Sequence, residues 1–555
     1  MTKKIQLLDC TLRDGAYING SLFGKNTIKG IIKRLSDAKV DIIECGWLKD
    51  QEHDNPDSSY FHVPQDVIPY LEKKDPNVTY VAMVDFDRYN VDNLPENDGS
   101  SIDAIRVVFP RGKAREGLDL AIKIREKGYR IFCQAANTLG YSDEELLDLI
   151  KLVNEVEPEA ISIVDTFGAM YPEDLDRILS IFSHNLKDNI TIGFHGHNNQ
   201  QLSFALCMQF VRYLTEQNRT MIVDSSLCGM GRGAGNATTE LVPTFLNKKH
   251  YGNYDLDLIM STIDMYMVPF LENFKWGYSI PTYIAGMYCS HVNNIDYLLK
   301  KHRANVKEIR SVISSLSPAD RVKYDYDLLE SKYIENQNHE IDDEKALNQL
   351  KANFANRNIL LIAPGKSSVT QSDIISDYAK ANDCIVIAVN ALIEGYDIDY
   401  LFLQSRVRYE YARETHPQLF SKIPKILLSN VREKARDNEY IIRYERAIKR
   451  GWVNFDNAMI CVLRLLDKLH VQNIAIAGFD TFSSKYNASY ADEMIPSVHG
   501  VENWDAMNKE IKEIYKDFRK RTQDTIKVTF VTKTDFISEY DRFVDKINRR
   551  EDLIT

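Results

Sequence analysis

Two histidines at a spacing of two, His195 and His197, stand at the end of a short apolar run, residues 190–194. On an extended strand, residues i and i+2 point to the same side, so both imidazoles can face one point. Neutral imidazoles are common ligands of divalent transition metals. The pair therefore predicts half of a metal site, although an HxH pattern alone is equally compatible with a surface loop.

The carboxylate that could complete this site is Asp14, in the segment DCTLRDG at residues 9–15. One carboxylate and two imidazoles give mixed oxygen and nitrogen ligation, which suits Mn²⁺, Zn²⁺, Fe²⁺ or Co²⁺ and leaves positions open for substrate oxygens. Arg13 beside it offers a permanently charged fork of donors, which suits an enolate oxygen. For the dipeptide by itself, a local surface ion pair is the favoured alternative.

A glycine-rich segment, GMGRGAGN at residues 229–236, lets the backbone approach a ligand or a metal closely. Its spacing does not match the GxGxxG pattern of dinucleotide-binding turns. Asn236 at its end could supply an amide oxygen as a further metal ligand, or it could cap a helix that starts near Thr238.

Short apolar strands alternate with amphipathic helices through the first part of the chain. The expected strands are residues 5–8, 41–45, 79–84, 104–109, 130–135, 160–164, 191–194 and 221–224, and the expected helices include 27–38, 114–127, 143–153, 172–183 and 200–217. This repeat predicts an α/β fold, a (β/α)8 TIM barrel over residues 1–240, rather than an open sheet. Barrel chemistry gathers at the carboxyl ends of the strands, where Glu44, Asp85 and Thr166 stand.

The rest of the chain divides into two further parts. Residues 241–335 read as a helical extension over the barrel mouth, in which Tyr278, Tyr288 or His291 could line the site, although packing in the core is the favoured role for such aromatics. Residues 350–555 show strands at 359–363, 384–388, 400–403, 425–428, 474–477 and 528–531, which predict an open Rossmann-like sheet. The turn APGKSS at residues 363–368 could hold the phosphate of a phosphorylated or nucleotide-linked ligand.

Length, charge and cysteine usage narrow the class of protein. The chain of 555 residues is longer than a single hydrophobic core usually supports, so we expect two or three domains. The net charge of −11 gives no support for nucleic acid or an anionic membrane as a partner. None of the eight cysteines forms a CxxC pair, which favours free thiols in a reducing compartment. We find no signal peptide and no run that approaches a membrane span, so we expect a cytoplasmic protein.

Four motifs in order resemble the DRE-TIM metallolyases: LDCTLRDG at residues 8–15, DTFG at 165–168, GFHGHN at 193–198 and GRGAGNA at 231–237. The phrase GFHGHNN looks most like the 4-hydroxy-2-oxovalerate aldolase branch. This resemblance covers about residues 5–242. It implies a barrel that holds one divalent metal by Asp14, His195 and His197, with Asn236 close by.

The resemblance also implies carbon–carbon bond making or breaking beside a metal-stabilised enolate of a 2-oxo acid such as pyruvate, with an aldehyde as the second substrate. Mn²⁺ is the cation that we expect, with Mg²⁺, Zn²⁺ and Co²⁺ as alternatives, and a homo-oligomer is expected. Arg13 would stabilise the enolate oxygen and Thr166 would bind the substrate carboxylate. Tyr17 stands where related aldolases carry a histidine that is taken as the base, and an unperturbed phenol has a pKa of about 10.

The departure at Tyr17 leaves two other interpretations open. One is a Claisen-type synthase or lyase that acts on an acyl-CoA, and the other is a binding or scaffold protein whose barrel has lost activity. Tyr17 could donate a proton, orient a hydroxyl group or simply pack in its loop.

Overall fold

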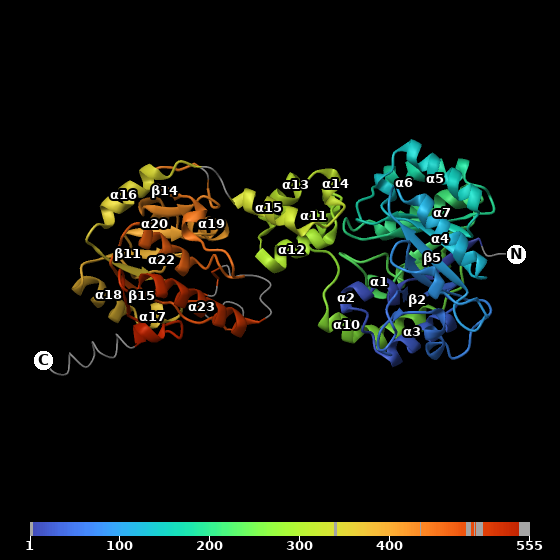
Figure 1. The fold of residues 1–555 in the computed structure, drawn as a ribbon, viewed down its shortest axis with the longest axis horizontal. Helices are drawn as coiled ribbons and strands as arrows, with labels where there is room; N and C mark the ends of the chain where they lie inside the picture. Colours follow the sequence, from blue (N-terminus) through green and yellow to red (C-terminus); the bar gives the residue numbers. More distant parts are fainter. Residues whose placement is uncertain are drawn as a thin grey trace. The chain divides into compact units, whose positions relative to one another are not determined.

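Eight parallel strands close into a barrel in the first half of the chain, which Figure 1 draws in blue to green. The strand order is β1-β9-β8-β7-β6-β5-β4-β2, and pairing of β1 with β2 completes the ring. The predicted TIM barrel is therefore confirmed. Its strands are β1 (Ile5–Asp9), β2 (Ile42–Leu48), β4 (Thr79–Asp85), β5 (Ala104–Phe109), β6 (Arg130–Ala135), β7 (Ala160–Asp165), β8 (Thr191–Gly196) and β9 (Met221–Ser225), and the short β3 (Tyr60–Phe61) pairs with β2.

This computed structural model describes residues 4–302, 304–337, 341–432, 434–483, 490–492, 494–495 and 503–542. The chain divides into two units, one made of Met1–Asp296 with Ile313–Asp325 and the other of Tyr297–Val312 with Tyr326–Thr555. The domain borders predicted from the sequence, near residues 240, 335 and 350, stay predictions.

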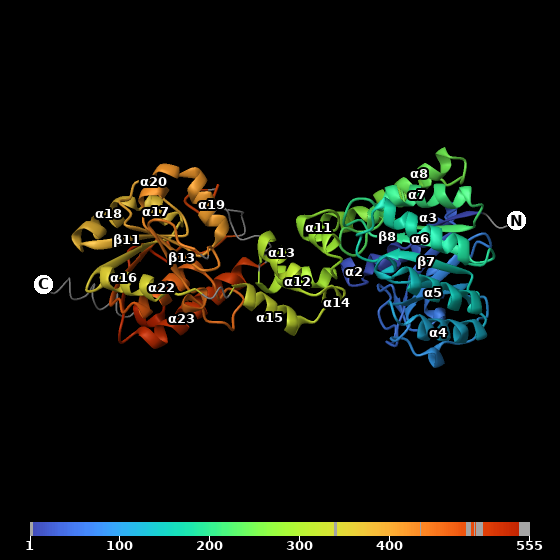
Figure 2. The same cartoon turned by 90° about the horizontal axis from the view of Figure 1, so that it is seen from above.

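Helices surround the barrel strands, and Figure 2 shows these helices on the outer side of the barrel. Each one buries an apolar stripe, because apolar residues recur every three or four positions. Local signals set their starts: Ser142 and Glu145 form a capping box before α5, and Pro172 begins α6. The helices are α3 (Lys25–Asp37), α4 (Ala114–Glu126), α5 (Asp143–Val156), α6 (Pro172–Asn185), α7 (Ser203–Glu216) and α8 (Leu241–Lys248).

The barrel interior changes from apolar to polar along the strands. One buried cluster contains Ile42, Ala104, Phe132, Ala160 and Ile222. Side chains two positions further along a strand point to the same side, so the next residues also face the interior. Those residues are Glu44, Arg106, Gln134, Ser162 and Asp224, all of them buried. The barrel interior thus has an apolar layer and, next to it toward the carboxyl ends of the strands, a polar layer.

The region after α8 is helical, as predicted. A break at residues 274–279 follows α10, and within it the Trp276 indole N–H donates to the Cys228 carbonyl at 2.9 Å. This bond ties the extension to the loop that follows β9. The helices are α9 (Leu256–Thr262), the π-helix η5 (Ile263–Met267), α10 (Val268–Asn273), α11 (Ile280–Met287), α12 (Val292–His302), α13 (Val306–Ser315), α14 (Pro318–Arg321) and α15 (Tyr326–Gln337).

The second unit holds an open sheet of seven parallel strands in the order β14-β13-β12-β11-β10-β15-β16. The predicted Rossmann-like α/β architecture is confirmed, although the sequence analysis missed β14. Helices that include α16 (Glu344–Phe354), α18 (Ser372–Ala381), α22 (Ala458–Lys468) and α23 (Trp504–Thr522) lie around this sheet in Figure 1. The strands are β10 (Asn358–Ile362), β11 (Cys384–Val389), β12 (Tyr400–Leu403), β13 (Lys425–Leu428), β14 (Glu439–Ile442), β15 (Asn473–Ala477) and β16 (Lys527–Phe530).

Within the described part of the chain, no helix has both the length and the apolar character that crossing a bilayer would require.

Candidate metal centre

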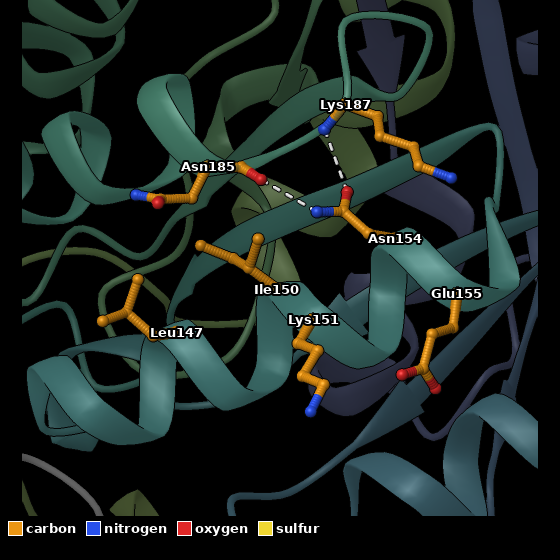
Figure 3. A pocket seen from close by; sticks show the side chains of 7 residues that line it. All are labelled: Leu147, Ile150, Lys151, Asn154, Glu155, Asn185 and Lys187. Carbon is orange, nitrogen blue, oxygen red and sulfur yellow. Dashed lines mark hydrogen bonds between the residues drawn. The ribbon is translucent and has the colours of Figure 1, made fainter.

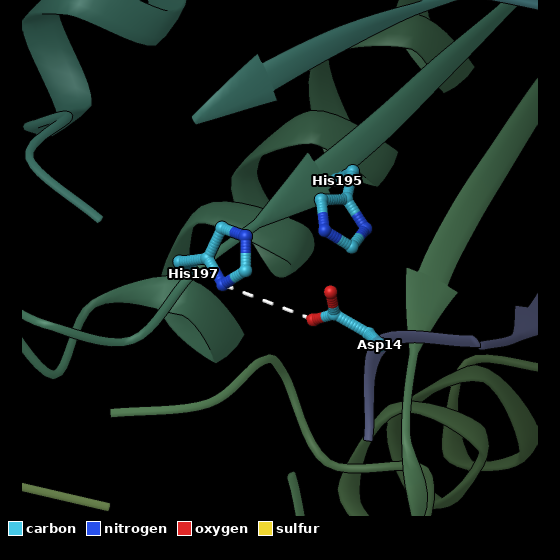
Figure 4. A group of neighbouring side chains, drawn as sticks. All are labelled: Asp14, His195 and His197. Carbon is cyan, nitrogen blue, oxygen red and sulfur yellow. Dashed lines mark ion pairs between the residues drawn. The ribbon is translucent and has the colours of Figure 1, made fainter. Parts of the chain in front are cut away.

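Asp14, His195 and His197 bring one ligand atom each within 4.8 Å of one another, and Figure 4 shows the three side chains converging. Asp14 ends the one-turn helix α1 (Thr11–Asp14) after β1, whereas His195 lies in β8 and His197 directly follows it. Their exposed fractions are 1%, 3% and 8%. The structure therefore joins residues from opposite ends of the barrel sequence into one buried group.

Two buried polar atoms at this group have no hydrogen-bond partner among the described residues, Nδ1 of His197 and Oδ1 of Asn236. Nδ1 of His197 lies 4.0 Å from Oδ2 of Asp14, and the Asn236 amide donates to that same oxygen at 2.7 Å. A divalent cation would satisfy these oxygen and nitrogen atoms, which otherwise cost free energy when buried. The alternative that Asn236 caps a helix is wrong, because α8 begins at Leu241 without any side-chain cap.

The charges around the group keep two of its members in the forms that bind a cation. Burial by itself would raise the pKa of Asp14, but the positive charge of Arg13, the two neighbouring histidines and the hydrogen bond from Asn236 together outweigh burial and hold that pKa well below the usual range. Burial lowers the pKa of His197 to about 3, so its ring is neutral near pH 7. An ionised carboxylate beside a neutral imidazole is the state that metal ligation requires.

His195 is oriented by a carboxylate that the sequence analysis did not single out. Nδ1 of His195 donates to Oδ2 of Asp224 at 3.0 Å, which leaves Nε2 for the site. Asp224 also accepts from the buried guanidinium of Arg106. Charged residues inside the apolar strands AIRVVF and MIVDS were the signal that could have revealed this pair.

Arg13 is held by two carboxylates inside the barrel. Its Nε donates to Glu44 Oε2 at 2.8 Å, and its Nη1 donates to Asp14 Oδ1 at 2.6 Å. All three side chains are buried, so the interpretation of Arg13 and Asp14 as a surface ion pair is wrong. Glu44 does not end its strand as expected, since β2 continues to Leu48 through an irregularity between Glu44 and Trp47.

A cavity of about 280 Å³ opens over the group and is large enough for a small organic acid. Its wall combines three arginines, Arg13, Arg88 and Arg232, with apolar side chains such as Phe109 and Val164. The predicted residues Arg13, Asp14, Tyr17, Thr166, His195 and His197 all line it.

Tyr17 and Thr166 reach this cavity from different loops. Tyr17 belongs to the short helix α2 (Ala16–Asn19) and is 41% exposed, yet desolvation raises the pKa of its phenol to about 12, with Arg232 acting against that shift. The phenol is therefore neutral over the physiological range. Thr166 Oγ1 accepts from the Asn137 backbone N–H at 2.6 Å, so its own hydroxyl hydrogen can be donated to a ligand.

Comparison with known proteins shows which family the barrel sequence resembles. Residues 111–268 match the family described as HMGL-like. The chain carries an HMGL-like domain. The matched stretch contains His195, His197 and Asn236, whereas Arg13 and Asp14 precede it.

Individual relatives of the HMGL-like domain are distant. An oxaloacetate decarboxylase of Mycobacterium tuberculosis is 24% identical and aligns with 46% of this chain and 73% of its own length. A 4-hydroxy-2-oxovalerate aldolase of Geobacillus genomosp. 3 is 25% identical over 48% of this chain and 78% of its own. A solved structure, the N-terminal domain of a putative aldolase from Bacteroides vulgatus, is 23% identical with a TM-score of 0.46 and covers 53% of this chain and 97% of that one.

A second hollow lies on the outer helical face of the HMGL-like domain, and Figure 3 shows it beside α5. It is wide and open, and two of its members, Asn154 and Lys187, bond to each other through the Lys187 backbone N–H at 2.9 Å. Nothing in it resembles the convergent ligands of the barrel cavity. The lining residues are Leu147, Ile150, Lys151, Asn154, Glu155, Asn185 and Lys187.

The three candidates in the extension separate in the structure. Tyr278 is largely exposed, and Tyr288 lies under the guanidinium of Arg321 at 5.1 Å. His291 is not among the residues that line the cavity, but its Nε2 lies 3.4 Å from Nη1 of Arg232, which does line it.

In the turn after β10 of the second unit, the two donors of Ser367 are already used. The Ser367 backbone N–H, which a phosphate would need, donates to Asp480 Oδ2 at 2.8 Å, and the Ser367 hydroxyl bonds to the same carboxylate. The following helix α17 (Ser367–Thr370) has one turn. The phosphorylated or nucleotide-linked ligand of this half stays a prediction.

Proposed function

We propose that the HMGL-like domain is a divalent-metal-dependent aldolase or lyase that acts on a 2-oxo acid, with pyruvate as the acid that is released in cleavage or supplies the enolate in the reverse direction. The observation that supports this most is the convergence of Asp14, His195 and His197 beside Arg13 in one cavity. Mn²⁺ is the cation we assign, since mixed carboxylate and imidazole ligation suits it. Asn236 would contribute the amide oxygen that has no other partner among the described residues.

Residues of the chain would divide the chemistry between them. A cation held here would supply Lewis acidity toward the 2-oxo group. Arg13, fixed by Glu44, would donate hydrogen bonds to the oxygen that becomes negative in the enolate. Thr166 would donate its hydroxyl to the carboxylate of the acid. Tyr17, as a neutral phenol, would donate a hydrogen bond to the 4-hydroxyl or aldehyde oxygen rather than act as a base.

In the cleavage direction, the bond between C3 and C4 of a 4-hydroxy-2-oxo acid breaks. The 4-hydroxyl group loses its proton to solvent water and becomes the aldehyde, and the bonding electrons pass to C3 to give the enolate, which then takes up a proton from water to form a methyl group. The names of the two relatives fit this chemistry, because cleavage of oxaloacetate or of 4-hydroxy-2-oxovalerate between C3 and C4 leaves pyruvate.

Proton exchange at the methyl group of pyruvate tests the proposal directly. Purified protein loaded with Mn²⁺ would be incubated with pyruvate in D₂O, quenched with a chelator and followed by the loss of the methyl proton signal. We expect exchange in wild type without coenzyme A, and exchange reduced by at least roughly a hundred-fold in Asp14→Asn, which lacks a charged ligand.

Asp119→Asn is the matched control, because Asp119 is an exposed carboxylate on α4. Exchange that needs an acyl-CoA would instead identify a Claisen-type enzyme. Protein that neither binds Mn²⁺ nor promotes exchange would contradict the aldolase and indicate a scaffold.

A further inference from the structure

Arg232 is a cation of the cavity wall without a carboxylate partner among the described residues. It follows Gly231, where an added Cβ would meet Asp14 Oδ2 and Asn236 Nδ2 at 2.5 Å, so the arginine stands one residue from the metal group. Its guanidinium lies 3.8 Å from the ring centre of Tyr17, which 41% exposure places at the cavity mouth. Arg13, in contrast, is bound by Glu44 and Asp14.

His291 is the second group at this position, and a backbone contact fixes which of its nitrogens carries hydrogen. The Asn293 backbone N–H donates to His291 Nδ1 at 3.1 Å, as expected for a residue that precedes α12 and accepts from the second residue of the helix. Desolvation lowers the pKa of the ring to about 3, so it is neutral. A neutral imidazole has one acceptor nitrogen, and Nδ1 is already used. Nε2 therefore carries the hydrogen.

This assignment makes two donors face each other. Nη1 of Arg232 lies 3.4 Å from Nε2 of His291, and an arginine N–H cannot donate to a nitrogen that itself carries hydrogen. The backbone of His291 is fixed, since its N–H donates to the Arg321 carbonyl at 2.8 Å. Two adjacent donors, one of them on the cavity-lining Arg232, are satisfied by one shared acceptor, and a charged acceptor forms the stronger bonds.

We propose that Arg232 and His291 bind an anionic group, a carboxylate or a phosphate, at the far end of the aldehyde that is joined to the 2-oxo acid. This inference rests on the proposed function and names its second substrate as an acidic aldehyde. The metal group and Arg13 would hold the 2-oxo acid, and the Arg232–His291 pair would hold the other end of the molecule. The methyl group at C3 of the acid would lose one proton to give the enolate, C3 would then bond to the aldehyde carbon, and the aldehyde oxygen would take up a proton.

Matched aldehydes test the preference. Aldol addition of pyruvate by the Mn²⁺-loaded full-length protein would be compared for butanal against succinic semialdehyde and for glyceraldehyde against glyceraldehyde 3-phosphate. We expect one anionic member to exceed its neutral counterpart in kcat/KM by roughly ten- to a hundred-fold, as charge-assisted hydrogen bonds give. The pair that shows the preference distinguishes a carboxylate from a phosphate.

Variants assign the preference to the two side chains. Arg232→Gln and His291→Phe should reduce the ratio of anionic to neutral kcat/KM to near one, whereas His291→Gln, which keeps a donor, should retain part of it. Arg115→Gln, an exposed arginine on α4, should keep the wild-type ratio. The inference would be overturned by a wild-type enzyme without any preference for the anionic aldehyde, or by an Arg232→Gln variant that retains the preference. Either result, obtained with an enzyme that still exchanges the methyl protons of pyruvate, would leave the proposed function standing.

A spectroscopic readout does not depend on turnover. Protein labelled with ¹⁵N-histidine would show the ring nitrogens of His291, assigned by loss of its signals in His291→Gln. We expect the hydrogen on Nε2, and a shift of that signal on addition of succinate or inorganic phosphate. A ring protonated at Nδ1, or an Nε2 signal that neither anion moves, would refute the anion site even if methyl exchange failed as well.

Discussion

Nδ1 of His195 lies 3.0 Å from Oδ2 of Asp224, and both side chains are buried in the barrel. Because Asp224 is ionised by the charge of Arg106 despite its burial, it accepts this hydrogen bond and fixes the imidazole with Nε2 toward Asp14. Asp224 on β9 thus orients His195 on β8, which is one of the candidate metal ligands.

Substitution of Asp224 by Asn should weaken metal binding. The amide retains the shape but loses the charge that makes His195 a better ligand, and such supporting carboxylates change metal affinity by about ten- to a hundred-fold. Titration calorimetry with Mn²⁺ would measure this change, with Asp119→Asn as the control. An unchanged dissociation constant in a folded variant would show that Asp224 serves the fold alone.

Metal binding should raise thermal stability. A ligand at a hundred times its dissociation constant stabilises the native state by about 2.7 kcal/mol, because it does not bind the unfolded chain. We expect Mn²⁺ to raise the Tm of wild type and of His184→Ala, whose histidine is exposed on α6, but not that of His197→Ala. Differential scanning calorimetry with and without a chelator measures this, and an equal rise in all three proteins would place the ion elsewhere.

Loss of Arg106 should destabilise the barrel strongly. Arg106 contacts both Glu44 and Asp224, and its removal leaves two buried carboxylates with one partner fewer each. Breaking a buried ion pair from one side costs roughly 3–5 kcal/mol. Urea unfolding of Arg106→Met should show a loss of this size, compared with little change for Arg115→Met, and a change below about 1 kcal/mol would contradict the role of the network.

Acidification should reduce stability through His291. Its pKa falls from 6.5 to about 3 on folding, so the unfolded chain binds more protons between these values and stability is lost as the pH decreases. The difference in unfolding free energy between pH 7.5 and pH 5 should be smaller in His291→Gln than in wild type or His184→Gln. Burial raises the pKa values of Asp9 and Asp165 to about 6, so these two groups make the protein more stable as the pH decreases. Their contribution is the same in all three proteins and does not affect the comparison. Equal pH dependence in all three proteins would contradict a neutral His291 in the native state.

The amino-acid sequence by itself determined the barrel and the residue types of its candidate metal group. The eight strands were predictable because each is a short apolar run between amphipathic helices, and the HxH pattern fixes two imidazoles on one side of a strand by local geometry. β14 was missed, because its apolar run has only three residues, Tyr440–Ile442, and follows a charged stretch.

Only the tertiary structure decided which side chains support the site. Closure of the barrel pairs β1 with β9 and β2, and this long-range pairing brings Asp14 to the histidines and Arg106 to Asp224 and Glu44. The meeting of Arg232 with His291 depends on how the extension packs on the loop after β9. Such contacts join residues far apart in the chain, and no periodicity within a strand or a helix records them.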